Sequence, residues 1–184
     1  MKYCANCGSP VVFRTPSGDD RPRYLCERCG IVHYQNPRMV VGCIPLWEDR
    51  ILFCRRAIEP RRGKWTIPAG FLEIGETVAE GAERETHEEA RAGVTGLKPY
   101  FLYDLTFIGQ VYLMFIGNLS DGTYGVGEES LEVRLFRETE IPWDELAFPV
   151  IWKCLKLYVE DSKTGQFPFR TGAMRKRPNI PDHT

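Results

Sequence analysis

The sequence predicts an α+β fold in which helices pack on a sheet, with a small separate unit ahead of it. Apolar, β-branched segments of strand length recur between residues 39 and 136. Two segments, 77–90 and 149–160, show helical spacing instead. Four of the seven cysteines lie within the first 29 residues, ahead of all these segments. The cysteine-rich start is therefore expected to form a unit of its own.

Length and composition limit the possible classes of protein. A chain of 184 residues, 43% hydrophobic and 12% aromatic, suits one ordinary domain with a small appendage. The net charge of −1 gives no reason to expect general attraction to nucleic acid or membranes. The start, MKYCANCGSP, lacks the apolar stretch of a secretory signal, and no run is long enough to span a membrane. We expect a cytoplasmic protein that does not enter a membrane.

The N-terminal cysteines form two pairs. Cys4 and Cys7 are separated by two residues, as are Cys26 and Cys29, and eighteen residues lie between the pairs. This spacing matches a zinc ribbon, in which two tight turns supply four thiolates to a tetrahedral site. We expect residues 1–33 to form it, with zinc supplying the folding energy that so small a core cannot. Disulfides are the alternative, but seven cysteines cannot all pair, and a cytoplasm keeps thiols reduced.

Single residues around the cysteines support this interpretation. Gly8 and Gly30 each follow the second cysteine of a pair, where the turn needs a residue that tolerates positive φ. The other cysteines, Cys43, Cys54 and Cys154, lie in apolar segments. We interpret them as buried side chains rather than nucleophiles.

The remaining elements follow in order along the chain. The expected strands are 39–47, 51–54, 65–69, 97–108, 110–119 and 131–136, and the expected helices are 77–90 and 149–160. Thr77 is the expected N-cap of the first helix, and Glu80 three residues later completes a capping box. We place a boundary at 34–37, one domain at 37–165 and a basic tail at 166–184.

The first helix carries the most informative pattern. Glu85, Glu88 and Glu89 stand at i, i+3 and i+4, so a helix places three carboxylates on one side. Like charges this close destabilise an isolated helix by roughly 0.2–0.5 kcal/mol per pair. A divalent cation turns that repulsion into coordination, because hard ions such as Mg²⁺ prefer carboxylate oxygens. The alternative is an acidic helix face that is merely solvated. The regular spacing of Gly70 and Glu76 ahead of the three glutamates argues against this alternative.

The whole stretch 70–91, GFLEIGETVAEGAERETHEEAR, resembles the Nudix box, the signature of enzymes that hydrolyse a nucleoside diphosphate linked to another group. The preceding GKWTIPAG is similar to the usual lead-in of that family. The resemblance implies an α/β/α sandwich with a mixed sheet. Arg91 stands where the family usually has glycine, and Thr86 and Ala92 where it has large apolar residues. These departures concern how the helix ends, and Gly93 can provide the stop two residues later.

The resemblance also implies roles for residues. The implied ligands of two or three Mg²⁺ or Mn²⁺ ions are Glu85, Glu88, Glu89 and the backbone carbonyl of Ala69. Such ions neutralise the charge of a pyrophosphate bridge, activate water and place the leaving group. Glu76 and Arg84 are implied to support the ligands, since an arginine can hold a carboxylate bidentately and fix its rotamer.

Residues outside the box are expected to complete the site. In the Nudix family a further glutamate usually completes the metal shell or acts as base, and Glu129 and Glu132 are the candidates, with Glu132 preferred. His87 lies inside the box and is expected to be an exposed helix residue. The candidates for contacts to substrate phosphate are Arg55, Arg56 and Arg61, and those for stacking on adenine are Tyr103, Phe107 and Tyr112.

The segments YQNPRMVVGC (34–43) and ESLEVRLF (129–136), with the ribbon, resemble one Nudix subgroup. Its plant relatives are plastid FAD pyrophosphatases that also cleave ADP-ribose. The resemblance implies hydrolysis of ADP-ribose or FAD with release of AMP. It also leads us to expect that the ribbon props the catalytic domain or helps to form a homodimer.

Two alternatives remain open. The first is an NADH pyrophosphatase, because these enzymes also carry a zinc ribbon. They have a SQPWPFPxS signature, of which this chain has only the fragment Phe148-Pro149. The second alternative is a nucleic-acid-binding regulator that uses the ribbon. The intact carboxylates, and the lack of a basic stripe with interleaved aromatic residues in 1–33, argue against it.

Overall fold

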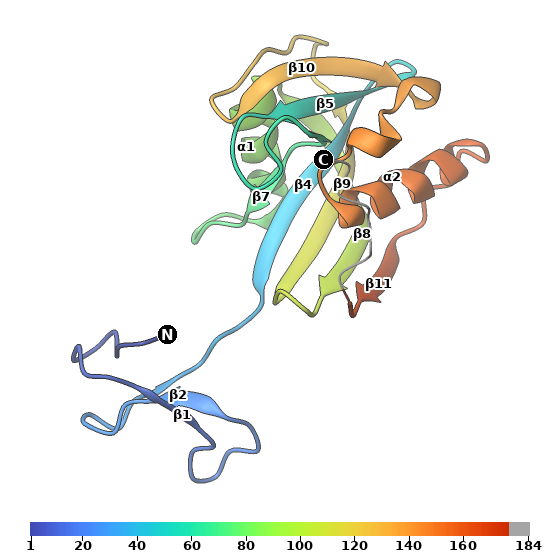
Figure 1. The fold of residues 1–184 in the computed structure, drawn as a ribbon. Helices are drawn as coiled ribbons and strands as arrows, with labels where there is room; N and C mark the ends of the chain where they lie inside the picture. The colour runs from blue at the N-terminus through green and yellow to red at the C-terminus, as the bar shows by residue number, and fades with distance from the viewer. Residues whose placement is uncertain (177–184) are drawn as a thin grey trace. The chain divides into compact units, whose positions relative to one another are not determined.

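The structure, a computed structural model, describes residues 1–176. The chain divides into two compact units, Met1–Pro37 and Arg38–Thr184, which Figure 1 shows in colours that follow the sequence. The division falls at the end of the segment 34–37, where the sequence predicts a boundary. No helix within the described residues has the length and the apolar run that crossing a bilayer requires.

The first unit is a three-stranded antiparallel sheet with two cysteine-bearing turns. Its strands are β1 (Val12–Arg14), β2 (Arg23–Leu25) and β3 (Val32–His33), in the order β1-β2-β3. Cys4 and Cys26 are the only buried residues of this unit. The unit therefore has almost no apolar core, as its size predicts.

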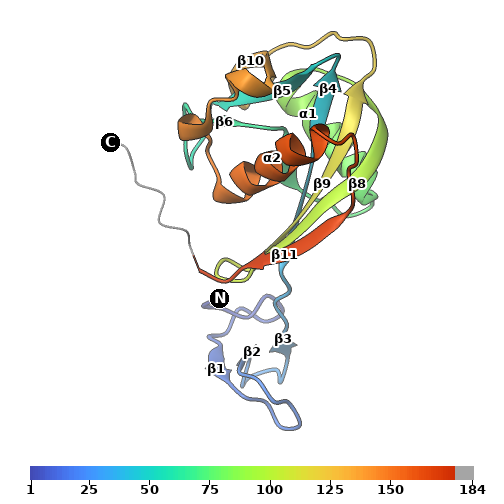
Figure 2. The same cartoon turned by 90° about the vertical axis from the view of Figure 1, so that its right-hand side faces the viewer.

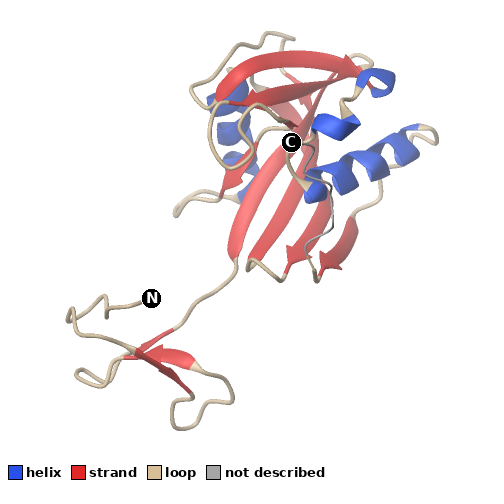
Figure 3. Ribbon diagram, in the orientation of Figure 1, coloured by secondary structure: helices blue, strands red, loops and turns tan. Residues whose placement is uncertain are grey.

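The second unit is built on one eight-stranded sheet, shown in Figure 3. Its strands are β4 (Arg38–Trp47), β5 (Arg50–Arg56), β6 (Trp65–Thr66), β7 (Ala69–Phe71), β8 (Val94–Leu105), β9 (Gln110–Leu119), β10 (Ser130–Arg137) and β11 (Arg170–Met174). The main order is β10-β5-β4-β9-β8-β11, with β6 on β5 and β7 on β4. The pairs β4–β9 and β8–β11 are parallel and the other pairs are antiparallel, so the sheet is mixed, as predicted.

Helices cover both faces of this sheet. They are α1 (Val78–Ala90) and α2 (Pro149–Ser162), and two short 3₁₀ turns, η1 (Glu138–Glu140) and η2 (Trp143–Glu145), precede α2. Successive residues of a strand point to opposite faces. Val40 of β4 accordingly belongs to the cluster that includes Ile151 and Leu155 of α2, while Val41 packs with Ala82 of α1. Figure 2 shows the two helices on opposite sides of the sheet, which makes the predicted α/β/α sandwich.

The cysteines outside the first unit are core residues. Cys43, Cys54 and Cys154 are each at most 1% exposed. Burial raises the pKa of all three thiols above the ordinary value, which keeps them protonated and unreactive. All seven cysteines of the chain are free, so the disulfide alternative is not realised.

Two predicted elements differ in the structure. The segment 65–69 does not form one strand, because β6 ends at Thr66 and β7 begins at Ala69. Pro68 lies between them and has no N–H to donate to a ladder, although its carbonyl accepts a hydrogen bond from Cys43 at 3.1 Å. The strand predicted at 97–108 runs from 94 to 105 and ends in a turn.

Part of the predicted basic tail belongs to the sheet. Arg170–Met174 forms β11, parallel to β8 at the edge of the sheet. A buried contact explains why: Asp161 of α2 accepts a hydrogen bond from the Tyr100 hydroxyl at 2.8 Å and pairs with Arg170. The end of the predicted tail, 177–184, lies outside the described residues.

Candidate active site and cysteine cluster

A cavity of about 1430 Å³ lies in the second unit, and most of the acidic residues of the segment 70–91 line it. It exceeds the roughly 300–1,000 Å³ of an ordinary small-molecule pocket, which leaves room for a dinucleotide. The acidic residues that line it are Glu59, Glu73, Glu85, Glu88, Glu89, Glu128 and Glu129. Arg56, Arg61, Arg84 and Arg91 line it as well.

Helix α1 begins as the sequence predicts. The Thr77 hydroxyl accepts a hydrogen bond from the Glu80 N–H, and the Glu80 carboxylate accepts one from the Thr77 N–H, so the capping box is complete. The helix then carries Glu85 and Glu89 on its buried side, at 9% and 6% exposure, while Glu88 is exposed. The three carboxylates reach the same cavity.

Arg84 links these carboxylates to one another. Its guanidinium binds Glu76 bidentately, with N–O distances of 2.9 and 2.8 Å, and holds the pKa of that carboxyl at about 2. The same side chain donates to Glu85 at 2.7 Å, to Glu88 at 3.0 Å and to the carbonyl of Phe71 at 3.0 Å. The predicted bidentate contact is therefore present, and Arg84 restricts the rotamers of the carboxylates that it binds.

Glu89 shows the chemistry of a cation site most clearly. Its Oε2 atom is buried and has no hydrogen-bond partner among the described residues. Burial, followed by the charge of Glu85, raises the pKa of Glu89 to about 8, and burial also raises the pKa of Glu85. An orphaned carboxylate oxygen beside a second buried carboxylate fits a hard divalent cation. Ala69, the predicted carbonyl ligand, lines the cavity, and its backbone N–H opposes the rise in the pKa of Glu89.

The end of α1 corrects the prediction that Gly93 provides the stop. Arg91 itself adopts the left-handed conformation, at φ 49° and ψ 29°, and its N–H binds the His87 carbonyl at 2.9 Å. The loop before β10 satisfies the next carbonyls: Gly125 donates to Ala90 at 2.7 Å and Gly127 to Glu89 at 3.1 Å. The helix therefore stops where the family usually has glycine, although arginine occupies the position.

The two candidate glutamates outside the box lie in different surroundings. Glu129 lines the cavity, and its backbone carbonyl accepts the Ala57 N–H at 2.7 Å. Glu132 does not line the cavity; it lies opposite Arg55 in the β10–β5 pair, 3.7 Å from that guanidinium, and is about half exposed. The geometry thus favours Glu129 over Glu132, the residue preferred from sequence.

The other predicted contact residues divide in the same way. Arg56, Arg61, Phe107 and Tyr112 line the cavity, whereas Arg55, Tyr103 and His87 do not. Tyr103 stacks on Phe101 instead, with ring centroids 4.0 Å apart. His87 is exposed on α1, as expected.

Three residues that line the cavity were not expected there from the sequence: Ile58, Pro60 and Phe148. Ile58 and Pro60 lie between β5 and β6, in a segment that matches no motif. Phe148 is the N-cap of α2 and precedes Pro149 at the first helical position, so the helix-start signal could have drawn attention to it.

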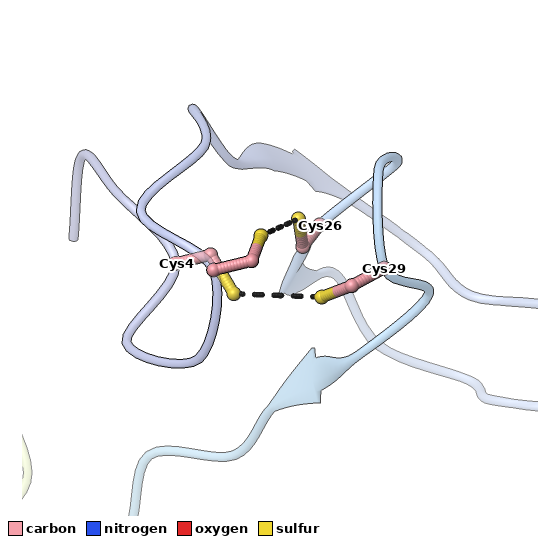
Figure 4. A group of neighbouring side chains, drawn as sticks. Cys4, Cys26 and Cys29 are labelled. Atoms are coloured by element: carbon pink, nitrogen blue, oxygen red, sulfur yellow. Dashed lines mark hydrogen bonds between the residues drawn. The ribbon is translucent and has the colours of Figure 1, made fainter.

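The four N-terminal cysteines meet in one cluster (Figure 4). Their sulfur atoms all lie within 4.8 Å of one another, with Cys4 to Cys29 at 3.7 Å and Cys7 to Cys26 at 3.5 Å. A tetrahedron with sulfurs about 2.3 Å from a central zinc has edges of about 3.8 Å. A backbone hydrogen bond from Ser9 is the largest of the contacts that lower the pKa of Cys7 to about 6. The cluster thus fits a tetrathiolate metal site.

The turns that carry these cysteines repeat one geometry. Gly8 and Gly30 have φ of 71° and 74°, and their N–H groups bind the carbonyls of Cys4 and Cys26 at 2.9 and 2.8 Å. The expectation of positive φ at both glycines is confirmed. His33 of β3 also reaches the cluster, with Nε2 3.2 Å from Cys4 Sγ.

Comparison with known proteins agrees with this division into two units. Residues 2–35 match the family model described as Nudix N-terminal, a zinc ribbon, and residues 36–156 match the model of the NUDIX domain. The crystal structure of a NUDIX hydrolase from Nitrosomonas europaea is 52% identical, with a TM-score of 0.92 over 96% of this chain and 100% of that one. An ADP-ribose pyrophosphatase from Streptococcus suis, 18% identical with a TM-score of 0.61 over 76% of this chain and 100% of that one, shares the fold.

Curated relatives are more distant. The NAD-capped RNA hydrolase NudC of Chromobacterium violaceum is 31% identical over 71% of this chain and 48% of its own length. The protein of the same name from Photobacterium profundum is 24% identical over 77% of this chain and 52% of its own length. The chain thus spans about half the length of the curated relatives it matches.

Proposed function

We propose that this chain, which belongs to the Nudix family, is a pyrophosphohydrolase that cleaves the diphosphate of an NAD-type dinucleotide with release of AMP. The observation that most supports cation-dependent hydrolysis is the acidic cavity, which Glu85, Glu88 and Glu89 line, and in which the buried Glu89 Oε2 has no hydrogen-bond partner among residues 1–176. ADP-ribose and FAD share the adenosine diphosphate half of NAD, and they are the second candidates.

The box residues have distinct proposed roles. Glu85, Glu88 and Glu89 hold the divalent cation, Mg²⁺ or Mn²⁺, with the Ala69 carbonyl as a further donor. That cation supplies neutralisation of the diphosphate charge and activation of water. Arg84 holds Glu85 and Glu88 in place through the contacts it makes to both.

Glu129 is the proposed residue that completes the site, as a further ligand or as a base. Its backbone is fixed to Ala57 at the end of β5, and its side chain faces the same cavity as Glu85 and Glu89. A general base needs to lie within hydrogen-bond reach of the proton it takes, which Glu129 satisfies better than Glu132 because only the former lines the cavity.

Two observations support NAD-type substrates over ADP-ribose and FAD. The curated relatives are named NAD-capped RNA hydrolases. In addition, Phe148-Pro149, the fragment that the chain shares with the NADH pyrophosphatase signature, lines the cavity. The incomplete signature is the reason to retain ADP-ribose and FAD.

The ribbon has a proposed structural role. Zinc is the metal that best suits four clustered thiolates, because structural zinc sites of this kind are tetrahedral and closed. We expect the ribbon to support the catalytic unit or a homodimer.

The test is a substrate panel with Mg²⁺ or Mn²⁺. NADH, NAD-capped RNA, FAD and ADP-ribose are each incubated with the wild type, with Glu88→Gln and with Glu83→Gln, and release of the nucleoside monophosphate is measured. Removing a cation ligand is expected to lower kcat on the order of 100- to 1,000-fold. Glu83→Gln is the matched control, because Glu83 is exposed on α1 and does not line the cavity. Equal turnover by wild type and Glu88→Gln would contradict the assignment.

A further inference from the structure

Arg56 is a buried cation in the wall of the cavity. It is the last residue of β5, only 9% of its surface is exposed, and it lines the same cavity as Glu85 and Glu89. Charged side chains are seldom buried unless a partner compensates the lost hydration. A partner that compensates the lost hydration of the Arg56 guanidinium is therefore expected.

The contacts of Arg56 within the protein are few. Its Nε donates to the Pro60 carbonyl at 2.9 Å, and its guanidinium lies over the Phe148 ring at 5.0 Å. Among residues 1–176, no carboxylate forms an ion pair with it and no other acceptor binds its two terminal nitrogens. Pro60 and Phe148 thus fix the plane of the guanidinium and leave its terminal donors for another partner.

The charge of Arg56 acts on the interior of the cavity. Arg56 lines the same cavity as Glu89 of the acidic helix and as Tyr112. Its positive charge therefore faces a cavity whose walls also carry carboxylates and aromatic rings.

We propose that Arg56 anchors the diphosphate of the substrate by donating its terminal N–H groups to phosphate oxygens, in the cavity that it shares with Glu85, Glu88 and Glu89, the residues that would hold a cation. The planar fork of arginine matches phosphate oxygens, and hydrogen bonds between ions are stronger than neutral ones. This inference rests on the proposed function and adds a substrate-binding residue outside the box.

Arg55 provides a matched control in the same strand. Its Nε donates to the Gly63 carbonyl at 2.9 Å, so both arginines fasten the segment between β5 and β6 by an equal bond. Arg55, however, is 3.7 Å from Glu132 and does not line the cavity. If the loop contact alone matters, substitution of either arginine should weaken binding of the substrate. If Arg56 binds phosphate, only its substitution should do so.

The experiment compares Arg56→Gln, Arg56→Lys and Arg55→Gln as full-length proteins. Binding of ADP and of AMP is measured by calorimetry with Ca²⁺ in place of Mg²⁺, and kcat/KM is measured on the best substrate of the panel. We expect Arg56→Gln to weaken ADP binding and to lower kcat/KM by roughly 10- to 100-fold. Arg56→Lys should lie between it and the wild type, because an ammonium keeps the charge but lacks the fork. Arg55→Gln should resemble the wild type.

Each outcome has one meaning. If Arg56→Gln and Arg55→Gln bind ADP equally well in an enzyme that releases AMP, the proposed role of Arg56 is wrong. If the wild type itself releases no AMP from any dinucleotide, the proposed function is wrong instead. Should Arg56→Gln fail to fold, Arg56→Lys decides: ADP binding equal to that of the wild type would overturn the role, and weaker binding would support it.

Discussion

The two units of this chain surround their candidate metal ligands with different neighbours. In the first unit, two of the four clustered cysteines are the only buried residues, so little else supports the sheet. In the second unit, apolar side chains from β4, β9, α1 and α2 form the core. There Arg84 and the capping box already arrange the carboxylates of α1.

The two units are expected to differ in how metal binding relates to folding. A small unit without a core needs its metal in order to fold, because the binding energy is then the folding energy. A unit with a large core folds first and presents ligands whose mutual repulsion a cation relieves. The same chain should therefore respond in two ways to the loss of metal.

The largest expected effect comes from chelation. A strong chelator should unfold 1–37 and leave 38–176 folded, because a structural zinc supplies about 10–16 kcal/mol to such a unit. Hydrogen exchange, followed segment by segment, measures the result. Zn²⁺ should restore protection in 1–37, whereas Mg²⁺ should restore activity alone. Unchanged exchange in 1–37 after removal of the metal would contradict the comparison.

Gly127→Ala tests whether packing arranges the catalytic unit. A Cβ at Gly127 would overlap the backbone carbonyl of Glu88, which cannot move without displacing α1. We expect a loss of roughly 1–3 kcal/mol in the free energy of unfolding, measured with urea, and a lower kcat because Glu129 follows in the same loop.

The control for this variant is Gly125→Ala. A Cβ at Gly125 would lie at an ordinary 3.5 Å from Arg91, so this variant should remain close to the wild type. Equal losses in both variants would mean that the close approach at Gly127 is not what holds the loop.

The contact between Glu76 and Arg84 should make the stability of the catalytic unit depend on pH. Arg84 holds the pKa of Glu76 at about 2, below the ordinary 4.5. A depressed folded-state pKa stabilises the protein fully above about 4.5, and this contribution is lost as the pH falls towards 2. Thermal unfolding between pH 6 and 2.5 should show a smaller decline in Glu76→Gln and in Arg84→Lys than in the wild type. An equal fall of the unfolding temperature with pH in all three proteins would mean that the contact between Glu76 and Arg84 does not stabilise the fold.

The smallest effect is expected at Arg91. The ribbon places glycine at the left-handed position of each cysteine-bearing turn, Gly8 and Gly30, whereas helix α1 ends on a left-handed arginine. Arg91→Gly should raise the free energy of unfolding by up to about 1 kcal/mol, since glycine avoids the left-handed penalty but loses more entropy on folding. Urea denaturation measures it, and a clear destabilisation would show that the Arg91 side chain matters more than its backbone.

Patterns between near neighbours in the sequence predicted much of this protein. The spacing of Cys4, Cys7, Cys26 and Cys29 predicted their cluster, and Thr77 with Glu80 predicted the start of α1. The i, i+3, i+4 spacing of the glutamates placed them on one side of that helix. Such patterns are readable because helix and turn geometry fixes which close neighbours share a face.

The tertiary structure was needed to show which of two nearby residues of the same type lines the cavity. Arg56 rather than Arg55, and Glu129 rather than Glu132, line the cavity. The register of β10 on β5 and the docking of a loop on the end of α1 make these choices. A shift of one residue along a strand changes the face to which a side chain points, and no local pattern reports it.

The sequence by itself therefore determined the family, the two units and the carboxylates of α1, because local spacing and composition carry that information. Only the tertiary structure decided which arginine and which outer glutamate line the cavity together with those carboxylates, and that Arg91 could end the helix. These decisions depend on contacts between residues far apart in the chain, where strand register, burial and the close approach of two backbones act together.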